Sequence, residues 1–321
     1  MKKLLAGAYS RLALLLFAGM FGLMGYLLLA DSRAATSSTS LESELGTRSS
    51  LVLQLTDSNA SAGAAVKFAT TSGIAKPDAS NTGYASLTST YSGSTYNSTS
   101  NATYDGVTFP DPGPGNWYTF TGSNLVFRNC RFPSDVWFEG NNVTMEHCEV
   151  TGGVSINNSN AVLLQYNNIH HWSDAVHITS DSVTVKNVTM NYNFIHTPQP
   201  ICGAHSDGVQ LLGVDGFTAT YNFIDMGKMF PLCDDPNPLN GTFQIALDFT
   251  GVQNSNLTIS NNWLNGGGYI FRLYGCGPVS RVVNNRFGRD YTWGPVDTTG
   301  SSCLADKSGN VYDDSDAPIG L

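Results

Sequence analysis

Four side chains that can transfer protons or stabilise charge, His177, Gln210, Asp248 and Arg272, occupy one place in a repeated five-residue pattern. Each copy carries large apolar residues at its first and third places. Successive side chains of a strand point to opposite faces, so these apolar pairs face a core and the residue between them faces outward. The imidazole can titrate near neutrality and the guanidinium can hold an anion. The predicted outward column is Thr119, Trp137, Ser155, His177, Gln210, Asp248 and Arg272.

A second periodicity indicates the element that positions this column. Triplets of Asn or Cys, any residue and an apolar residue begin at eight positions, with successive spacings of 18, 19, 26, 29, 40, 23 and 25 residues. Units of this size that contribute short strands and polar turns are typical of a solenoid whose coils stack only on their neighbours. We therefore predict an all-β parallel β-helix. The triplets begin at Cys130, Cys148, Asn167, Asn193, Asn222, Asn262, Asn285 and Asn310.

The composition and the amino end favour an exported protein. Charged residues make up only 13% of the chain, and its net charge of -9 argues against a nucleic-acid partner. Lys2, Lys3 and Arg11 precede an apolar run over residues 12–30, which suits a signal peptide or a membrane anchor helix. We expect an extracellular or cell-surface monomer, attached to the membrane only if this segment is not cleaved.

We divide the chain into four parts. The segment around residues 64–68 is a candidate strand and resembles the end of a jelly-roll carbohydrate-binding module, too short to form that module alone. A solenoid end is otherwise an exposed sheet edge, so a cap is expected before the first coil. The predicted parts are a signal peptide or anchor at 1–34, a Ser/Thr-rich linker with the possible module remnant at 35–76, an N-terminal cap at 77–116, and the coils and tail at 117–321.

The six cysteines suit an oxidising compartment. Cys130 and Cys148 occupy the same place in adjacent coils, about 4.8 Å apart, which a disulfide accepts; two stacked reduced thiols are the alternative. Cys202 and Cys233 lie in the two largest insertions. The predicted pairs are Cys130–Cys148, Cys202–Cys233 and Cys276–Cys303.

The coil pattern resembles right-handed parallel β-helix proteins of the pectate-lyase-like superfamily, from about residue 77 onward. Pro77 to Gly83, His205 to Gln210 and Gly309 to Asp314 are similar to stretches of secreted bacterial members, whose activities are mostly unassigned. The resemblance implies a polysaccharide bound along the outside of one sheet, between long loops. The insertions at 196–204 and 226–243 fall where such loops are expected.

The resemblance implies a lyase that acts on an acidic glycan by β-elimination. Such an enzyme needs a base and a positive group that neutralises the uronate carboxylate. Arg272 is the predicted neutralising group, with Asp248 beside it, and His177 or His205 is the predicted base. The predicted substrate-binding residues are Trp137, Ser155, Gln210 and Tyr274.

A calcium site is a further expectation at Asp174 and Asp207. The two carboxylates fall in one column about 4.8 Å apart, where they repel each other unless a proton or a cation lies between them. Asp234 and Asp235 in the long loop are possible additional ligands. Turn capping by both aspartates is the alternative.

Two other functions remain open. A hydrolase similar to polygalacturonases would use Asp207 and Asp248 as acid and base, although His205 to Gly208 matches that family's motif only at Asp207 and Gly208. A non-catalytic module that binds glycan or mediates adhesion would need only the exposed ladder of side chains. Detection of unsaturated products would separate elimination from binding.

Overall fold

The computed structural model describes residues 52–56, 64–68, 74–277, 279–297 and 304–321, and these form two units that we describe separately. In the first unit, β1 (Val52–Thr56) pairs antiparallel with β2 (Ala64–Phe68). The strand expected around residues 64–68 is therefore present. The predicted signal or anchor segment lies outside the described residues. None of the described residues belongs to a helix with the length and apolar character of a membrane span.

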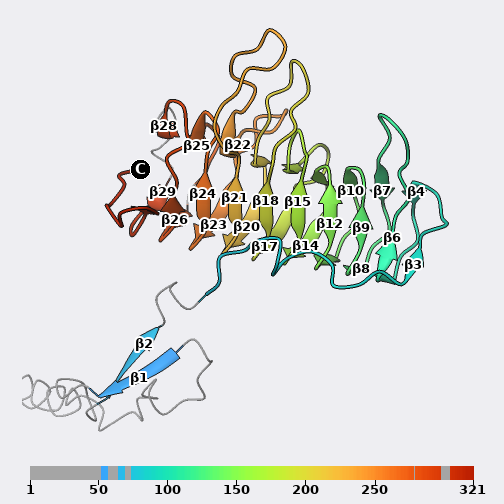
Figure 1. Ribbon diagram of the computed structural model, residues 1–321, viewed down its shortest axis with the longest axis horizontal. Helices are drawn as coiled ribbons and strands as arrows, with labels where there is room; N and C mark the ends of the chain where they lie inside the picture. The colour runs from blue at the N-terminus through green and yellow to red at the C-terminus, as the bar shows by residue number, and fades with distance from the viewer. Residues whose placement is uncertain (1–51, 57–63, 69–73, 278, 298–303) are drawn as a thin grey trace, which may run out of the picture. The chain divides into compact units, whose positions relative to one another are not determined.

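The second unit is a parallel β-helix, as predicted. Its described strands form three sheets in which every neighbouring pair is parallel, and each coil contributes one strand to each sheet (Figure 1). Consecutive strands of a sheet come from consecutive coils, so side chains at equivalent places stack along the helix axis.

We number the sheets by their order along a coil. The first sheet contains β4 (Tyr96–Asn97), β7 (Tyr118–Phe120), β10 (Val136–Phe138), β13 (Val154–Asn157), β16 (Val176–Thr179), β19 (Val209–Leu212), β22 (Gly241–Ala246), β25 (Tyr269–Leu273) and β28 (Gly294–Asp297).

The second sheet contains β5 (Ala102–Asp105), β8 (Leu125–Arg128), β11 (Val143–Glu146), β14 (Asn160–Gln165), β17 (Lys186–Asn191), β20 (Asp215–Thr220), β23 (Ser255–Ser260), β26 (Ser280–Val283) and β29 (Leu304–Asp306). The third contains β3 (Ser89–Thr90), β6 (Val107–Thr108), β9 (Arg131–Phe132), β12 (Glu149–Thr151), β15 (Asn168–His170), β18 (Phe194–His196), β21 (Phe223–Asp225), β24 (Trp263–Asn265), β27 (Arg286–Phe287) and β30 (Val311–Tyr312). The segment 77–116 thus already contributes β3 to β6 to the sheets.

The core is the stack of inward side chains between the three sheets. Ile156, Ile178, Leu211, Ile245 and Leu273 follow one another on successive strands of the first sheet and are fully buried. Rows of like residues pack well because each rung lies about 4.8 Å above the last. The alternation used to predict the outward column is therefore the alternation of core and surface in the first sheet.

A continuous amide ladder closes the turn between the second and third sheets. The Nδ2 of Asn193 donates to the Oδ1 of Asn222 at 2.8 Å, and the Nδ2 of Asn222 donates to the Oδ1 of Asn262 at 2.9 Å. Each Oδ1 also accepts the backbone N–H of the asparagine before it. The ladder satisfies buried turn groups that water cannot reach. Its asparagines are Asn167, Asn193, Asn222, Asn262, Asn285 and Asn310.

Two cysteines begin this ladder, and they correct one predicted disulfide. Cys130 and Cys148 are buried free thiols, and the backbone N–H of Cys130 donates to the Sγ of Cys148 at 3.3 Å. The Sγ thus takes the acceptor role that Oδ1 has in the asparagines. The prediction of a Cys130–Cys148 bond was wrong, because adjacent places in a ladder suit stacked thiols as well as a disulfide.

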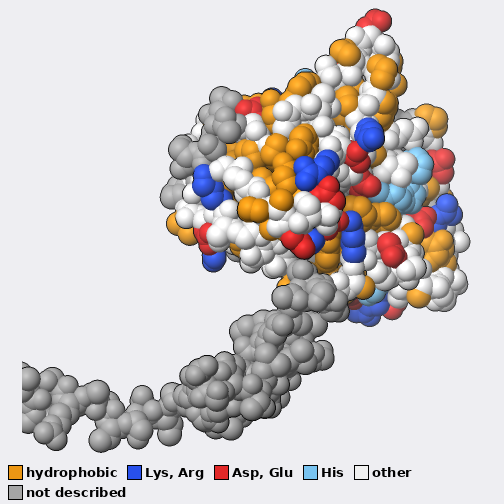
Figure 2. Space-filling view, turned by 60° about the vertical axis from the view of Figure 1, so that its left-hand side comes forward, with side chains coloured by type: hydrophobic (Ala, Val, Ile, Leu, Met, Phe, Trp, Pro, Cys, Tyr) orange, Lys and Arg blue, Asp and Glu red, His pale blue; other side chains and the backbone are white. Residues whose placement is uncertain are grey.

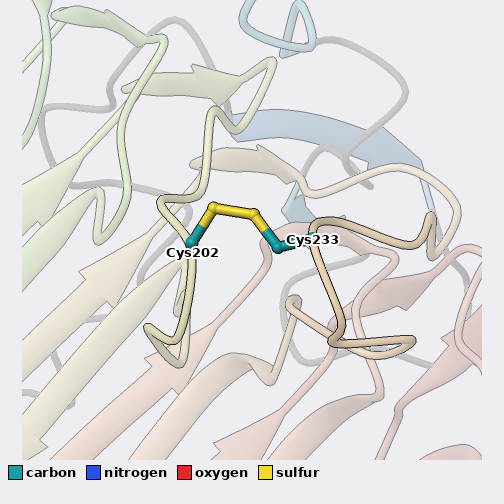
Figure 3. The surroundings of a disulfide bond; sticks show 2 residues. All are labelled: Cys202 and Cys233. Atoms are coloured by element: carbon teal, nitrogen blue, oxygen red, sulfur yellow. A yellow bond between two sulfur atoms is a disulfide. The ribbon is translucent and has the colours of Figure 1, made fainter.

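The predicted Cys202–Cys233 bond is present and links the two long loops before β19 and β22 (Figure 3). In Figure 1 these loops project together from the edge of the coil between the third and first sheets. The third predicted pair includes Cys303, which lies outside the described residues.

Candidate functional site

The outward column on the first sheet exists, with one correction. The register pairs Trp137 with Ser155, Ser155 with His177 and His177 with Gln210. Gln210 then pairs with Gln244, and Gln244 with Arg272, so Gln244 occupies the place predicted for Asp248. The observed column is Tyr96, Thr119, Trp137, Ser155, His177, Gln210, Gln244, Arg272 and Asp297.

Asp248 lies after the end of β22 and is 8% exposed. Its Oδ1 accepts the backbone N–H groups of Thr250 at 2.8 Å and Val252 at 2.7 Å, so it holds a turn. Burial raises the pKa of Asp248, but these hydrogen bonds outweigh it, and the net shift is downward. The prediction of Asp248 beside Arg272 was wrong because a shift of four residues, from Gln244 to Asp248, preserves strand alternation.

Arg272 is the centre of a polar network on this face. Its Nη1 donates to the Oδ1 of Asn240, and its Nε donates to the hydroxyl of Tyr274 at 3.0 Å. The Tyr274 hydroxyl donates to the Oδ2 of Asp297 at 2.5 Å, and the Nε of Arg272 lies 3.7 Å from the same oxygen. The amide of Asn240 also donates to the Oε1 of Gln244 at 3.2 Å.

Asp207 holds the network in place through a hydrogen bond with Asn240. It is fully buried, and its Oδ1 accepts the backbone N–H of Gly241 at 2.9 Å and the amide of Asn240 at 3.0 Å. Gln210, in the column as predicted, donates to its Oδ2 at 3.3 Å. Burial raises the pKa of Asp207 well above its usual value, and the neighbouring Asp174 raises it further.

Asp174 precedes the equivalent strand one coil earlier. Its Oδ1 accepts the backbone N–H of Asp207 at 2.8 Å. Burial raises the pKa of Asp174 to about 6. Both aspartates thus hold backbone groups of the next coil, which is the turn-capping alternative.

The residues present do not fit the predicted calcium site. The Asp207 oxygens face N–H donors, which a cation would have to displace. Asp234 and Asp235 line a separate hollow of about 550 Å³ beside the disulfide. Among the described residues, no group of three or more His, Cys, Asp or Glu side chains could hold a metal ion.

The two predicted bases lie apart from Arg272. His177 precedes it by three rungs in the column, which is about 14 Å at the usual strand spacing. Burial lowers the pKa of His177, and its buried Nε2 has no hydrogen-bond partner among the described residues. His205 is exposed in the loop before β19. The geometry brings together Arg272, Tyr274 and Gln210 of the predicted site, and neither histidine joins them.

Trp137 and Ser155 lie in the column toward the N-terminal coils. The Trp137 ring stacks on the ring of Trp117, with centroids 5.0 Å apart and planes inclined by 20°. Trp117 is 40% exposed and lines a groove of about 580 Å³. Sequence reasoning missed Trp117, because it precedes the repeated pattern by one residue.

A histidine cluster lies on a different face, where Figure 2 shows one gathering of His side chains. His170 and His196 pair on neighbouring strands of the third sheet, and the Nδ1 atoms of His170 and His171 lie 2.7 Å apart. Burial and the two neighbouring histidines lower the pKa of His196 to about 4. Burial lowers the pKa of His170 as well, so His170 and His196 are largely uncharged at neutral pH.

Asn240, Gln244 and Asp297 were also missed. Gln244 lies between Phe243 and Ile245, so the alternating pattern was present but was aligned four residues too late. Asn240 belongs to a loop, and no periodicity could place it. The sequence matches no family model, and comparisons with curated proteins and with solved structures find no match.

Proposed function

We propose that this protein is a polysaccharide lyase that cleaves an acidic glycan at Arg272 on the first sheet. The observation that supports this proposal best is the convergence of Asn240, Gln244 and Tyr274 around a guanidinium that remains partly exposed. Amide, guanidinium and hydroxyl donors are the groups that bind a carboxylate and stabilise charge as it develops there. Asp207 also supports the proposal, because its carboxylate accepts hydrogen bonds from Asn240 and Gln210 and so fixes the positions of both side chains.

In the proposed reaction Arg272 binds the uronate carboxylate and stabilises the carbanion that forms next to it. The Tyr274 phenol lies within hydrogen-bonding distance of Arg272, so a bound uronate would place its acidic C–H nearby. A phenolate at Tyr274 would remove that proton, a C=C bond would form as the C–O bond to the leaving sugar breaks, and the leaving oxygen would take a proton from water. Asp297 accepts a hydrogen bond from the phenol and orients it.

The fold and the long loops support the proposal that the protein belongs to the pectate-lyase-like superfamily. The three parallel sheets and the asparagine ladder fit that resemblance, and a right-handed winding is the rule for parallel crossovers. The loops joined by the disulfide provide a wall beside the first sheet. A cleaved signal peptide or an uncleaved anchor at residues 1–34 would place the β-helix outside the cell, where such glycans occur.

The alternative is glycan binding without cleavage. The stacked pair of Trp117 and Trp137 favours it, because exposed aromatic rings pack on sugar rings without any chemistry. Hydrolysis by Asp207 and Asp248 is less favoured, since both carboxylates hold backbone N–H groups.

Incubation with a panel of uronate polymers tests the proposal. We expect one polymer to yield products with the ultraviolet absorbance of unsaturated ends. Reducing ends that appear without this absorbance would indicate hydrolysis and contradict the lyase. Binding of a polymer with no new ends would establish the non-catalytic alternative.

A further inference from the structure

The groove beside Trp117 differs in charge from the Arg272 network. It lies between the loop 110–117 and the loop that carries Ile201, and its floor includes Asp135, His171 and Ser173. Asp111 and Asp135 line it, whereas no Lys or Arg does. Among the described residues, neither carboxylate forms an ion pair with a cationic side chain. A ligand with a carboxylate would therefore be repelled here.

The Asp135 carboxylate is held in a fixed position. Its Oδ1 accepts the backbone N–H of Gly153 at 2.6 Å. Gly152, at a φ of 141°, allows this approach, because a Cβ at that residue would lie 2.5 Å from the same oxygen. This contact uses Oδ1 and leaves Oδ2 for a ligand. A carboxylate fixed in this way loses little conformational entropy when it binds.

The N-terminal wall of the groove is also preorganised. The loop 110–117 contains three prolines, and the Tyr118 hydroxyl donates to the carbonyl of Pro110 at 2.7 Å. The Oδ1 of Asp111 accepts the backbone N–H of Gly113 at 2.9 Å within this loop. Trp117 ends the wall, and its ring is held against Trp137. An exposed ring in a stiff loop is a stacking platform for a sugar, and its face also attracts a cation.

We propose that this groove binds a saccharide segment with free amino groups, such as a glucosamine oligomer. One sugar ring stacks on Trp117, and its neighbours place ammonium groups against Asp135 and Asp111. The site is distinct from the Arg272 network, because no residue of that network lines the groove. One polysaccharide that carries both amines and carboxylates, or two glycans, could then be held on the two sides of the disulfide-linked loops.

Calorimetry on the full chain tests this site with three hexamers, of glucosamine, of N-acetylglucosamine and of galacturonate. We expect the glucosamine hexamer to bind and the other two to bind about fivefold more weakly, since one exposed ion pair contributes up to about 1 kcal/mol. Raising the salt concentration should weaken the binding. Equal binding of the N-acetylated hexamer, stronger binding of galacturonate, or no binding of glucosamine would overturn the proposal.

Three variants locate the binding. Asp135→Asn keeps the acceptor for Gly153 but removes the charge, and it should weaken glucosamine binding about fivefold. Asp306→Asn, on β29, and Arg272→Ala should leave the affinity unchanged. If Asp135→Asn does not fold, Asp111→Asn makes the same test. Unchanged affinity in a folded Asp135→Asn or Asp111→Asn variant would contradict the proposed site.

Discussion

The buried carboxyl group of Asp174 makes the stability of the folded protein depend on pH. Because burial raises the pKa of Asp174 to about 6, the folded protein retains a proton that the unfolded chain releases above about pH 4. The free energy of unfolding should therefore fall by up to about 3 kcal/mol as the pH rises from about 4 to about 6. Asp174→Asn keeps the acceptor for the N–H of Asp207 and should lack this fall.

Urea titrations at several pH values measure this difference. The variant should be more stable than the wild type above pH 6, and the two should converge near pH 4. Asp234→Asn, at an exposed loop position, provides the control. Parallel pH curves for the wild type and Asp174→Asn would contradict the account.

Tyr274 gives the proposed lyase a pH signature. Burial raises the pKa of Tyr274, and the Asp297 carboxylate raises it further, so the phenol is protonated at neutral pH. The cleavage rate should therefore still be increasing at pH 9 to 10, because the fraction of phenolate is increasing. Tyr274→Phe keeps the ring beside Arg272 and should lose at least about 100-fold in kcat. A rate that levels off above pH 6 would point to a histidine such as His177 instead.

Single residues of the site were predictable only where strand alternation placed them. Arg272, Gln210 and His177 lie in the outward column because each stands between two inward apolar residues. Asn240 could not be predicted, since its contact with Arg272 depends on a loop conformation. The network around Arg272 is therefore visible only in the structure.

At the scale of elements, the asparagine ladder makes the turn after the second sheet a strong structural feature. Asn222→Ala would leave the backbone N–H of Asn193 and the carbonyl of Met190 without their side-chain partners in a buried site. We expect a loss of about 3 kcal/mol in the free energy of unfolding, because each unpaired buried group costs about 1 to 3 kcal/mol. Chemical denaturation measures this loss in the free energy of unfolding.

The exposed Asn116→Ala is the matched control, because among the described residues its side-chain amide makes only a local contact, with the carbonyl of Pro114 at 3.3 Å. It should change the free energy of unfolding by less than about 0.5 kcal/mol. Equal effects of the two substitutions would show that the ladder is not a special source of stability.

The register of β22 marks the limit of prediction at this scale. Phe243 and Ile245 face the core, but Leu247 and Phe249 continue the same alternation beyond the strand and are exposed. Both alignments therefore satisfy the pattern, and only pairing with Val209 distinguishes them. The 40-residue interval between Asn222 and Asn262 removed the spacing that would have constrained the choice.

For the whole molecule, the stacking of the coils could be predicted from the sequence, whereas the arrangement of the site's side chains could not. The two periodicities report the stacking of coils, which depends on many residues and tolerates a local misalignment. Function depends on a few side chains brought together by loops, and a fold alone does not assign it. The two stacked thiols show the same distinction, since Cys130 and Cys148 were placed correctly and their bonding was not.

Cleavage at Arg272 is tested most directly by comparing two arginines of the same β-helix. On the uronate polymer that the wild type cleaves, kcat/KM is measured for Arg272→Ala and for Arg281→Ala. Arg281 lies in the second sheet and forms an exposed ion pair with Asp306 of the same sheet. We predict a loss of at least about 100-fold for Arg272→Ala and a change within about twofold for Arg281→Ala. Wild-type activity in a folded Arg272→Ala variant would contradict the account.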